Sequence, residues 1–258
     1  MKSVKVLNCE LDATTLRGAA DWAREWIHSG RRGYICTVNV AILMMMRSDP
    51  KLQAFIDRAS LVVADGQPLV WASHLQGAPL PERVTGIDLI DELCTVATEE
   101  DFGIYLLGAR PEVIKMVAER LAKRHPGLRI CGAADGYFDA AEAGARAREI
   151  RESRAKILVV GMGVPRQEEF IENHWDDLGV ELAIPVGGSF DVIAGVSRRA
   201  PLWLQRIGME WFFRLLQEPR RLWKRYLVTN VQFIFHLLIS LARPGAKEST
   251  TSTDAADA

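Results

Sequence analysis

Two short polar segments stand where predicted strands end, and their residue types are suited to acid–base chemistry. In TVN (37–39), Thr37 and Asn39 alternate with a valine and therefore share one face of a strand. Asp65 follows three apolar residues and precedes a glycine. A partly buried carboxylate beside a substrate hydroxyl can accept its proton, which makes Asp65 a candidate general base. The alternative is that Asp65 only caps a helix beginning near Gln67.

A third segment, GMGVPRQEEF (161–170), is typical of a turn that binds phosphate groups. It lacks the full GxGxxG pattern, because Arg166 occupies the third glycine position, and no GK[ST] follows as in a Walker loop. The N-terminus of a helix, together with Arg166 and Gln167, would suit a diphosphate. An ordinary strand-to-helix turn is the alternative.

Several other chemistries lack the residues that they need. GGSFD (187–191) has Asp191 where the nucleophile elbow of a hydrolase requires glycine. The five histidines and four cysteines are scattered, and neither HExxH nor CxxC occurs, so no zinc site is visible. We expect the cysteines to be free thiols in a reducing compartment. Asp-x-Asp is also missing, so we expect no metal bridge to a nucleotide diphosphate.

The elements that must position these residues alternate between strand and helix. Short apolar runs predict strands at 34–40, 60–66, 103–109, 128–136, 156–163 and 181–188. Amphipathic stretches predict helices at 14–29, 67–76, 86–100, 111–124, 139–153 and 165–175. Pro111 and Pro165 fall at first helical positions, where a missing N–H costs nothing. The alternation predicts an α/β, Rossmann-like fold, with a mostly parallel sheet covered by helices on both faces.

Glycines mark the ends of four predicted strands. They are Gly66, Gly108, Gly161 with Gly163, and Gly187 with Gly188. Ligands of open α/β sheets bind outside the carboxyl ends of the strands, where glycine lets backbone N–H groups approach an anion. We therefore expect the functional site at this edge of the sheet.

Charge and hydropathy divide the chain into three parts. The 258 residues carry a formal net charge of −1, which gives no overall signal for nucleic-acid binding. The stretch 198–243, however, holds nine Lys or Arg residues against two glutamates, which suggests a surface that meets an anionic partner. We expect an α/β domain at 1–200, a basic amphipathic helical appendage at 201–243 and a disordered tail at 244–258.

The appendage has the pattern of a helix at a membrane interface. Pro219 is predicted to separate two short helices, and the second carries a mainly apolar stripe flanked by Arg221, Lys224 and Arg225. The stripe residues are Trp223, Tyr226, Leu227, Asn230, Ile234 and Leu237. The apolar run at 227–242 has sixteen residues, whereas a membrane-spanning helix needs roughly 20. The alternative is a core helix or the seam of a homodimer.

Nine motifs, taken in order along the chain, resemble the bacterial WecG/TagA/CpsF glycosyltransferases. They are TVN (37–39), VADG (63–66), RVTGIDL (83–89), YLLGA (105–109), DGYF (135–138), VVGMGVPRQE (159–168), VGGSFD (186–191), RAPLW (199–203) and GMEWFFRLLQEPRR (208–221). The resemblance covers about residues 30 to 227. Two features depart from the family pattern: Arg166 stands where lysine is commoner, and the apolar extension 228–242 is longer than expected.

The resemblance implies an inverting transfer of a sugar from a UDP-sugar to a polyprenyl-diphosphate-linked saccharide, in the synthesis of a cell-surface or exopolysaccharide. It implies attachment to the cytoplasmic face of the plasma membrane and no metal or other cofactor. Asp65 takes the position of the general base, with Thr37 and Asn39 in the catalytic site. The matching substrate-binding positions are Arg83, Gly108, Asp135, Tyr137, Gly161, Gly163, Gln167 and Asp191. Without a metal, positive charge on the departing UDP must come from arginines and helix N-termini. The candidates in the appendage are Arg214, Arg221 and Lys224.

Two other functions are weighed beside the glycosyltransferase. A Rossmann-type oxidoreductase requires GxGxxG after its first strand, and the strand that ends in TVN has no such turn. A non-catalytic membrane adaptor on the same fold would tolerate the loss of Asp65. The donor sugar stays open among N-acetylmannosamine, its uronic acid and glucose, and so does the possibility of a homo-oligomer.

Overall fold

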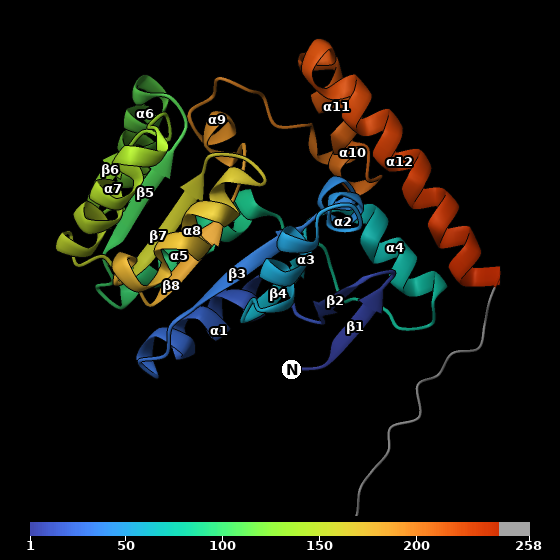
Figure 1. Cartoon of the computed structure of the whole chain (residues 1–258), viewed down its shortest axis with the longest axis horizontal. Coiled ribbons are helices and arrows are strands. Elements are labelled where there is room, and N and C mark those ends of the chain that lie inside the picture. Colours follow the sequence, from blue (N-terminus) through green and yellow to red (C-terminus); the bar gives the residue numbers. More distant parts are fainter. Residues whose placement is uncertain (243–258) are drawn as a thin grey trace, which may run out of the picture.

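The centre of the protein is a six-stranded parallel sheet with the strand order β4-β3-β8-β7-β5-β6 (Figure 1). The computed structural model describes residues 1–242, apart from the side chains of Arg221 and Arg225. The strands are β3 (Gly33–Val38), β4 (Leu61–Ala64), β5 (Ile104–Gly108), β6 (Ile130–Ala134), β7 (Ile157–Gly161) and β8 (Leu182–Pro185). Each overlaps one of the six predicted strands, so the parallel sheet predicted from the sequence is confirmed.

Helices cover both faces of this sheet. One core layer includes α1 (Leu16–His28), α5 (Gly86–Glu99), α6 (Pro111–Arg124) and α9 (Ser189–Ile193). The other includes α2 (Val40–Met46), α3 (Pro50–Asp57), α4 (Gln67–Leu75), α7 (Ala140–Glu152) and α8 (Arg166–Leu178). Successive strand residues enter opposite layers, as Leu106 and Leu107 do, because side chains alternate along a strand. The Rossmann-like fold is therefore confirmed.

Most predicted helices begin close to their expected positions. Pro111 is the first residue of α6, as predicted. Pro165 is instead the N-cap residue of α8, which begins at Arg166, one position later than predicted. Helix ends are set by local backbone geometry within a residue or two, which periodicity does not resolve.

Several short elements were not predicted from the sequence. The strands β1 (Ser3–Val6) and β2 (Cys9–Asp12) form an antiparallel hairpin beside β4, where Asp12 Oδ2 accepts a hydrogen bond of 2.8 Å from the Val62 N–H. The helices α2, α3, α9 and α10 (Leu202–Arg206) were also missed. They are too short to show a helical period, and α2 is apolar on nearly all sides because it is buried.

The C-terminal segment continues with α11 (Glu210–Gln217) and α12 (Pro219–Ala242). Pro219 begins α12, which confirms the predicted break, but α12 has 24 residues and is not the short helix expected. It packs along α2, and Figure 1 shows it as an outer wall with α2 and α4 between it and the sheet. Within residues 1–242, Leu222–Ala242 is the one helical stretch that could cross a membrane by length and composition alone. The tail predicted at 244–258 lies outside the described residues.

Candidate active site

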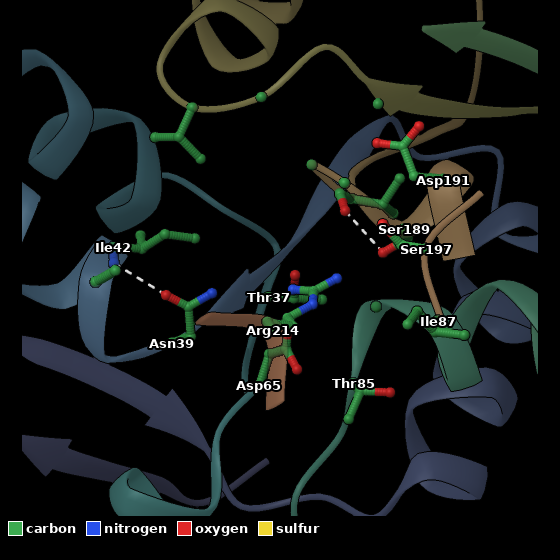
Figure 2. A pocket seen from close by; sticks show the side chains of 18 of the residues that line it. Thr37, Asn39, Ile42, Asp65, Thr85, Ile87, Ser189, Asp191, Ser197 and Arg214 are labelled. Carbon is green, nitrogen blue, oxygen red and sulfur yellow. Dashed lines mark hydrogen bonds between the residues drawn. The ribbon is translucent and has the colours of Figure 1, made fainter. Parts of the chain in front are cut away.

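A cavity of about 1080 Å³ lies where the carboxyl ends of the central strands meet the C-terminal helices. Its walls come from the turns after β3, β4, β7 and β8, the start of α5, and the inner sides of α11 and α12. Figure 2 shows side chains from these separate elements converging on Asp65 and Arg214. This is the edge of the sheet at which the sequence predicted a site.

Asp65 follows β4 directly and is held in place by its own backbone, whose N–H donates to the Val38 carbonyl at 2.7 Å. Burial raises the pKa of Asp65 to about 7, and the nearby Glu210 carboxylate acts in the same direction. Arg214, Arg83 and the Gly86 N–H oppose this shift by stabilising the ionised form. A carboxylate with a pKa near neutral can both accept and release a proton under physiological conditions.

The alternative role of Asp65 as a helix cap is wrong. The N-cap residue of α4 is Gly66, and among the described side chains none caps the first turn of this helix. The carboxylate therefore does not cap α4, and the backbone group that it contacts is the N–H of Gly86 at the start of α5.

Thr37 and Asn39 reach the cavity from the end of β3, on the same side as predicted. Asn39 is the N-cap residue of α2, and its Oδ1 accepts a hydrogen bond of 3.1 Å from the Ile42 N–H. That bond leaves the amide nitrogen on the side that faces Thr37 and Asp65 (Figure 2). Asn39 thus offers donors, and not an acceptor, to a molecule in the cavity.

Arg83 links the main domain to the appendage. Its guanidinium forms an ion pair with Glu210 at 2.8 Å and donates to Gln205 Oε1 at 3.2 Å. Both partners of the ion pair are mostly buried. Glu210 begins α11, so the ion pair brings Arg214, one turn further on, to the cavity beside Asp65.

A second ion pair holds the segment that leads into the appendage. Arg199 donates through both terminal nitrogens to the two carboxylate oxygens of Asp88, each at 2.6 Å. Although burial works against ionisation, hydrogen bonds from Arg199 and Thr85 hold the pKa of Asp88 below its usual value. The same pairing raises the pKa of Arg199. The bidentate pair fixes both the distance and the orientation of the Arg199 guanidinium relative to Asp88, and so holds the chain in place where it leaves the main domain.

The glycine turns serve two different purposes. Gly163 and Gly187 have φ values of 82° and 54°, in the left-handed region that favours glycine. Gly161 is required for space, because a Cβ there would lie 2.5 Å from the Phe190 ring. A Cβ on Gly108 would lie 2.4 Å from the Gly161 carbonyl oxygen, so only glycine at position 108 lets the two backbones pack this closely.

Comparison with known proteins shows the family to which the chain belongs. The family model "Glycosyl transferase WecG/TagA/CpsF family" matches residues 4–247, nearly the whole chain. The protein belongs to this family. Membership overturns the oxidoreductase alternative and confirms the resemblance and the assignment as a transferase.

Curated relatives carry a more specific name. The chain is 35% identical over 193 residues to a Bacillus subtilis (strain 168) protein, covering 75% of this chain and 74% of that protein. It is 32% identical over 224 residues to a Staphylococcus aureus (strain MW2) protein, covering 86% of each. Both relatives are named N-acetylglucosaminyldiphosphoundecaprenol N-acetyl-beta-D-mannosaminyltransferase.

Most of the residues predicted for the site of this glycosyltransferase line one cavity. They are Thr37, Asn39, Asp65, Arg83, Tyr137, Gly161, Gly163, Gln167, Asp191 and Arg214. Tyr137 is 69% exposed at the rim, where its N–H donates to Asp135 Oδ1 at 2.9 Å. Their contacts with substrates stay predictions.

Three other predicted residues with described side chains lie outside the cavity lining: Gly108, Asp135 and Lys224. Gly108 packs against Gly161, Asp135 shapes the loop that carries Tyr137, and the exposed Lys224 has its Nζ 5.6 Å from the centre of the Trp223 ring. The side chain of Arg221 lies outside the described part of the structure.

Sequence reasoning missed Glu210 and the pair formed by Asp88 and Arg199. All three stand inside motifs that carry the family resemblance, which was the available signal. Their pairing was invisible because the partners are more than 100 residues apart in the chain. Among residues 1–242, no group of three or more His, Cys, Asp or Glu is arranged to hold a metal ion.

Proposed function

We propose that this glycosyltransferase moves N-acetylmannosamine from a UDP-linked donor to a polyprenyl-diphosphate-linked N-acetylglucosamine, with inversion at the anomeric carbon. The names of the relatives support the sugar and the acceptor. The observation that carries the mechanism is Asp65, a partly buried carboxylate with a pKa near 7, at the centre of the cavity and beside Arg214.

The reaction is a single displacement. The acceptor hydroxyl oxygen attacks the anomeric carbon, the bond from that carbon to the diphosphate oxygen breaks, and UDP leaves with the bonding electrons. Asp65 accepts the hydroxyl proton as the new glycosidic bond forms. Arg214 and the turns after β7 and β8 supply positive charge and backbone dipoles to the leaving diphosphate, in place of a metal.

The two ends of the cavity differ in character. One end is bordered by the exposed ring of Tyr137, by Asp191 and by the glycine turns, which suits a nucleoside diphosphate. The other is bordered by Ile42 of α2 and by Leu222 and Tyr226 of α12, which suits the first units of a polyprenyl chain. We place the donor at the first end and the acceptor at the second.

The outer side of the appendage supports attachment to a membrane. Exposed apolar side chains lie on α12, α10 and α4. They include Trp71, Leu75, Leu202, Trp203, Trp223, Leu227, Val231, Ile234, Phe235 and Leu238. An exposed apolar surface of this kind on a protein with a lipid-linked acceptor fits an interfacial, peripheral position at the inner face of the plasma membrane.

The inner side of α12 favours a helix that lies on the bilayer over one that spans it. Phe233 belongs to the same core cluster as α2, and Leu222 is also buried. At the far end of the helix, Gln76 Nε2 donates to Ser240 Oγ at 3.2 Å. A spanning orientation would expose the core of α2 and break these contacts.

A donor screen tests the reaction. Purified full-length protein is supplied with a panel of UDP-sugars and a short-chain polyprenyl-diphosphate N-acetylglucosamine, and UDP release is measured, with product anomers assigned by NMR. We expect turnover with UDP-N-acetylmannosamine, at the same rate in excess EDTA as with added Mg²⁺. Turnover only with another donor would refute the proposed sugar, and a strict metal requirement would refute the charge assignment.

The Asp65→Asn variant tests the base and separates an enzyme from a non-catalytic adaptor. We expect kcat to fall ~10²–10⁴-fold, the usual effect of losing a general base, with UDP binding largely retained. A matched control is Asp177→Asn, an exposed carboxylate on α8 away from the cavity. Near-normal turnover by folded Asp65→Asn protein would rule Asp65 out as the base.

A further inference from the structure

Gln167 and Glu168 form a buried polar pair at the wall of the cavity, with side chains only 2% and 5% exposed. Gln167 Oε1 accepts hydrogen bonds from two backbone N–H groups, that of Gly163 at 3.2 Å and that of Gly187 at 2.9 Å. Gln167 Nε2 donates to Glu168 Oε1 at 2.8 Å. All three contacts agree on one amide orientation, because the reverse would set NH₂ against two donors and a carbonyl against a carboxylate.

The two bonded glycines belong to different turns. Gly163 follows β7 and Gly187 follows β8, which are neighbouring strands in the sheet. Both glycines have a left-handed backbone conformation, and a Cβ built on either would meet nothing within 4 Å. Neither glycine has a side chain that could anchor its turn, so the Gln167 carbonyl, which accepts a hydrogen bond from each, cross-links the two turns.

This arrangement changes what the turns can offer to a ligand. The N–H groups of Gly163 and Gly187 point at Gln167 and are already engaged. Other residues of the same turns, Met162 and Gly188, line the cavity. The amide therefore sets the spacing of the two turns, while a ligand meets their remaining backbone.

We propose that Gln167 and Glu168 are positioning residues, which together hold the two glycine turns at the separation that the diphosphate of the donor requires. The proposal rests on the proposed function in taking a nucleoside diphosphate as the ligand. Glu168 contributes by accepting a hydrogen bond from the amide inside the protein, where such a bond is strong and an unmatched partner is costly.

An exchange of the two side chains tests the pair. Gln167→Glu keeps an oxygen for both glycine N–H groups but sets a second carboxylate against Glu168. Glu168→Gln alone still offers Gln167 an acceptor oxygen. The double variant Gln167→Glu/Glu168→Gln restores one carboxylate and one amide in reversed order. Glu169→Gln, an exposed carboxylate on the next residue of α8, is the control.

Two readouts are taken on the full-length protein: hydrogen exchange of the Gly163 and Gly187 amides, and the Kd for UDP by calorimetry. We expect Gln167→Glu to speed exchange at both glycines and to raise the Kd ~10-fold or more, since a buried polar mismatch weakens the turns. The double variant should return within ~3-fold of the wild type, because it restores both the acceptor for the glycine N–H groups and the hydrogen bond between amide and carboxyl group. Glu169→Gln should change neither readout.

The proposal is overturned if Gln167→Glu leaves exchange and Kd unchanged, or if the double variant is no better than Gln167→Glu. Should Gln167→Glu fail to fold, Glu168→Leu replaces it. Removing the acceptor there should impair both readouts more than Glu168→Gln does, and equal effects would overturn the pair. A wild-type protein that does not bind UDP would refute the proposed function instead, while amide exchange still tests the cross-link.

Discussion

At the scale of single residues, opposing electrostatic influences set the pKa of Asp65. Burial and the Glu210 carboxylate favour its neutral form, whereas Arg214 and Arg83 favour the anion. The balance leaves the pKa at about 7, compared with an ordinary value of 3.8. A base of this strength has more affinity for a hydroxyl proton than an exposed aspartate has, and a large part of it is ionised near neutral pH.

This balance predicts the pH dependence of the reaction. As pH falls through 7, Asp65 becomes protonated and can no longer accept a proton, so kcat/KM should decline on the acid side with an apparent pKa near 7. Glu210→Gln removes an influence that raises the pKa, so its profile should move to lower pH. Steady-state rates from pH 5 to pH 9 measure this, with the exposed Glu119→Gln as control. A Glu210→Gln profile that coincides with the wild type would contradict the account.

The same shift predicts a cost to stability. Between pH 3.8 and about 7 the folded protein holds a proton on Asp65 that the unfolded chain has lost, so this residue lowers stability as pH rises through that window. Above pH 7 the cost is fully present, at most about 4 kcal/mol. Asp65→Asn should therefore raise the Tm at pH 8 but not at pH 3.5. A variant less stable than the wild type at pH 8 would show that the ionised carboxylate is better stabilised than its burial implies.

At the scale of elements, α12 has two apolar sides with different partners. The predicted stripe is divided between them: Tyr226, Asn230 and Leu237 are partly buried, whereas Trp223, Leu227 and Ile234 are exposed. The inner side packs on α2 with Phe233 at its centre. The outer side faces away from the protein and is the surface that we assign to the membrane.

Substitutions on the two sides of α12 should have opposite effects. Replacing Val231, Ile234 and Leu238 by glutamine should release the protein from anionic vesicles in a sedimentation assay and leave the Tm nearly unchanged, because all three side chains are exposed. Phe233→Ala should cost about 3–5 kcal/mol of stability instead, as deletion of a buried aromatic ring does. If the triple variant stays on vesicles but loses a dimer seen by light scattering, the outer side is a homodimer seam.

At the scale of the whole molecule, ion pairs decide where the appendage lies. Arg83 with Glu210 and Asp88 with Arg199 each join the main domain to the C-terminal segment. Between them runs the chain that carries α10. The cavity is therefore a joint product of two parts of the chain, and its electrostatics depend on how they are docked.

Breaking one ion pair should disturb both stability and catalysis. Asp88→Asn leaves the half-buried Arg199 without its charged partner, which should cost about 1.5–3 kcal/mol, the usual worth of hydrogen bonds to charged groups. We also expect slower turnover on a short-chain, detergent-soluble acceptor, because Arg214 is less firmly placed. Asp101→Asn, which breaks an exposed ion pair with Arg129, should change stability by less than about 1 kcal/mol. Unchanged activity in a destabilised Asp88→Asn protein would show that the pair serves stability alone.

The sequence by itself determined the six strands of the parallel sheet, their glycine ends and the edge of the sheet where the site lies. These features follow from local sequence. An apolar run such as KILVVG predicts a strand that is buried on both faces of a sheet. Parallel strands then bring their carboxyl ends to one edge of that sheet. Only the tertiary structure decided that Asp65 titrates near pH 7, that Arg83 pairs with Glu210, that Gln167 cross-links two turns and which side of α12 is buried. The physical reason is that the burial, charge and hydrogen bonding of a side chain depend on groups that are distant in the sequence. A local sequence pattern does not show which distant groups will lie beside it.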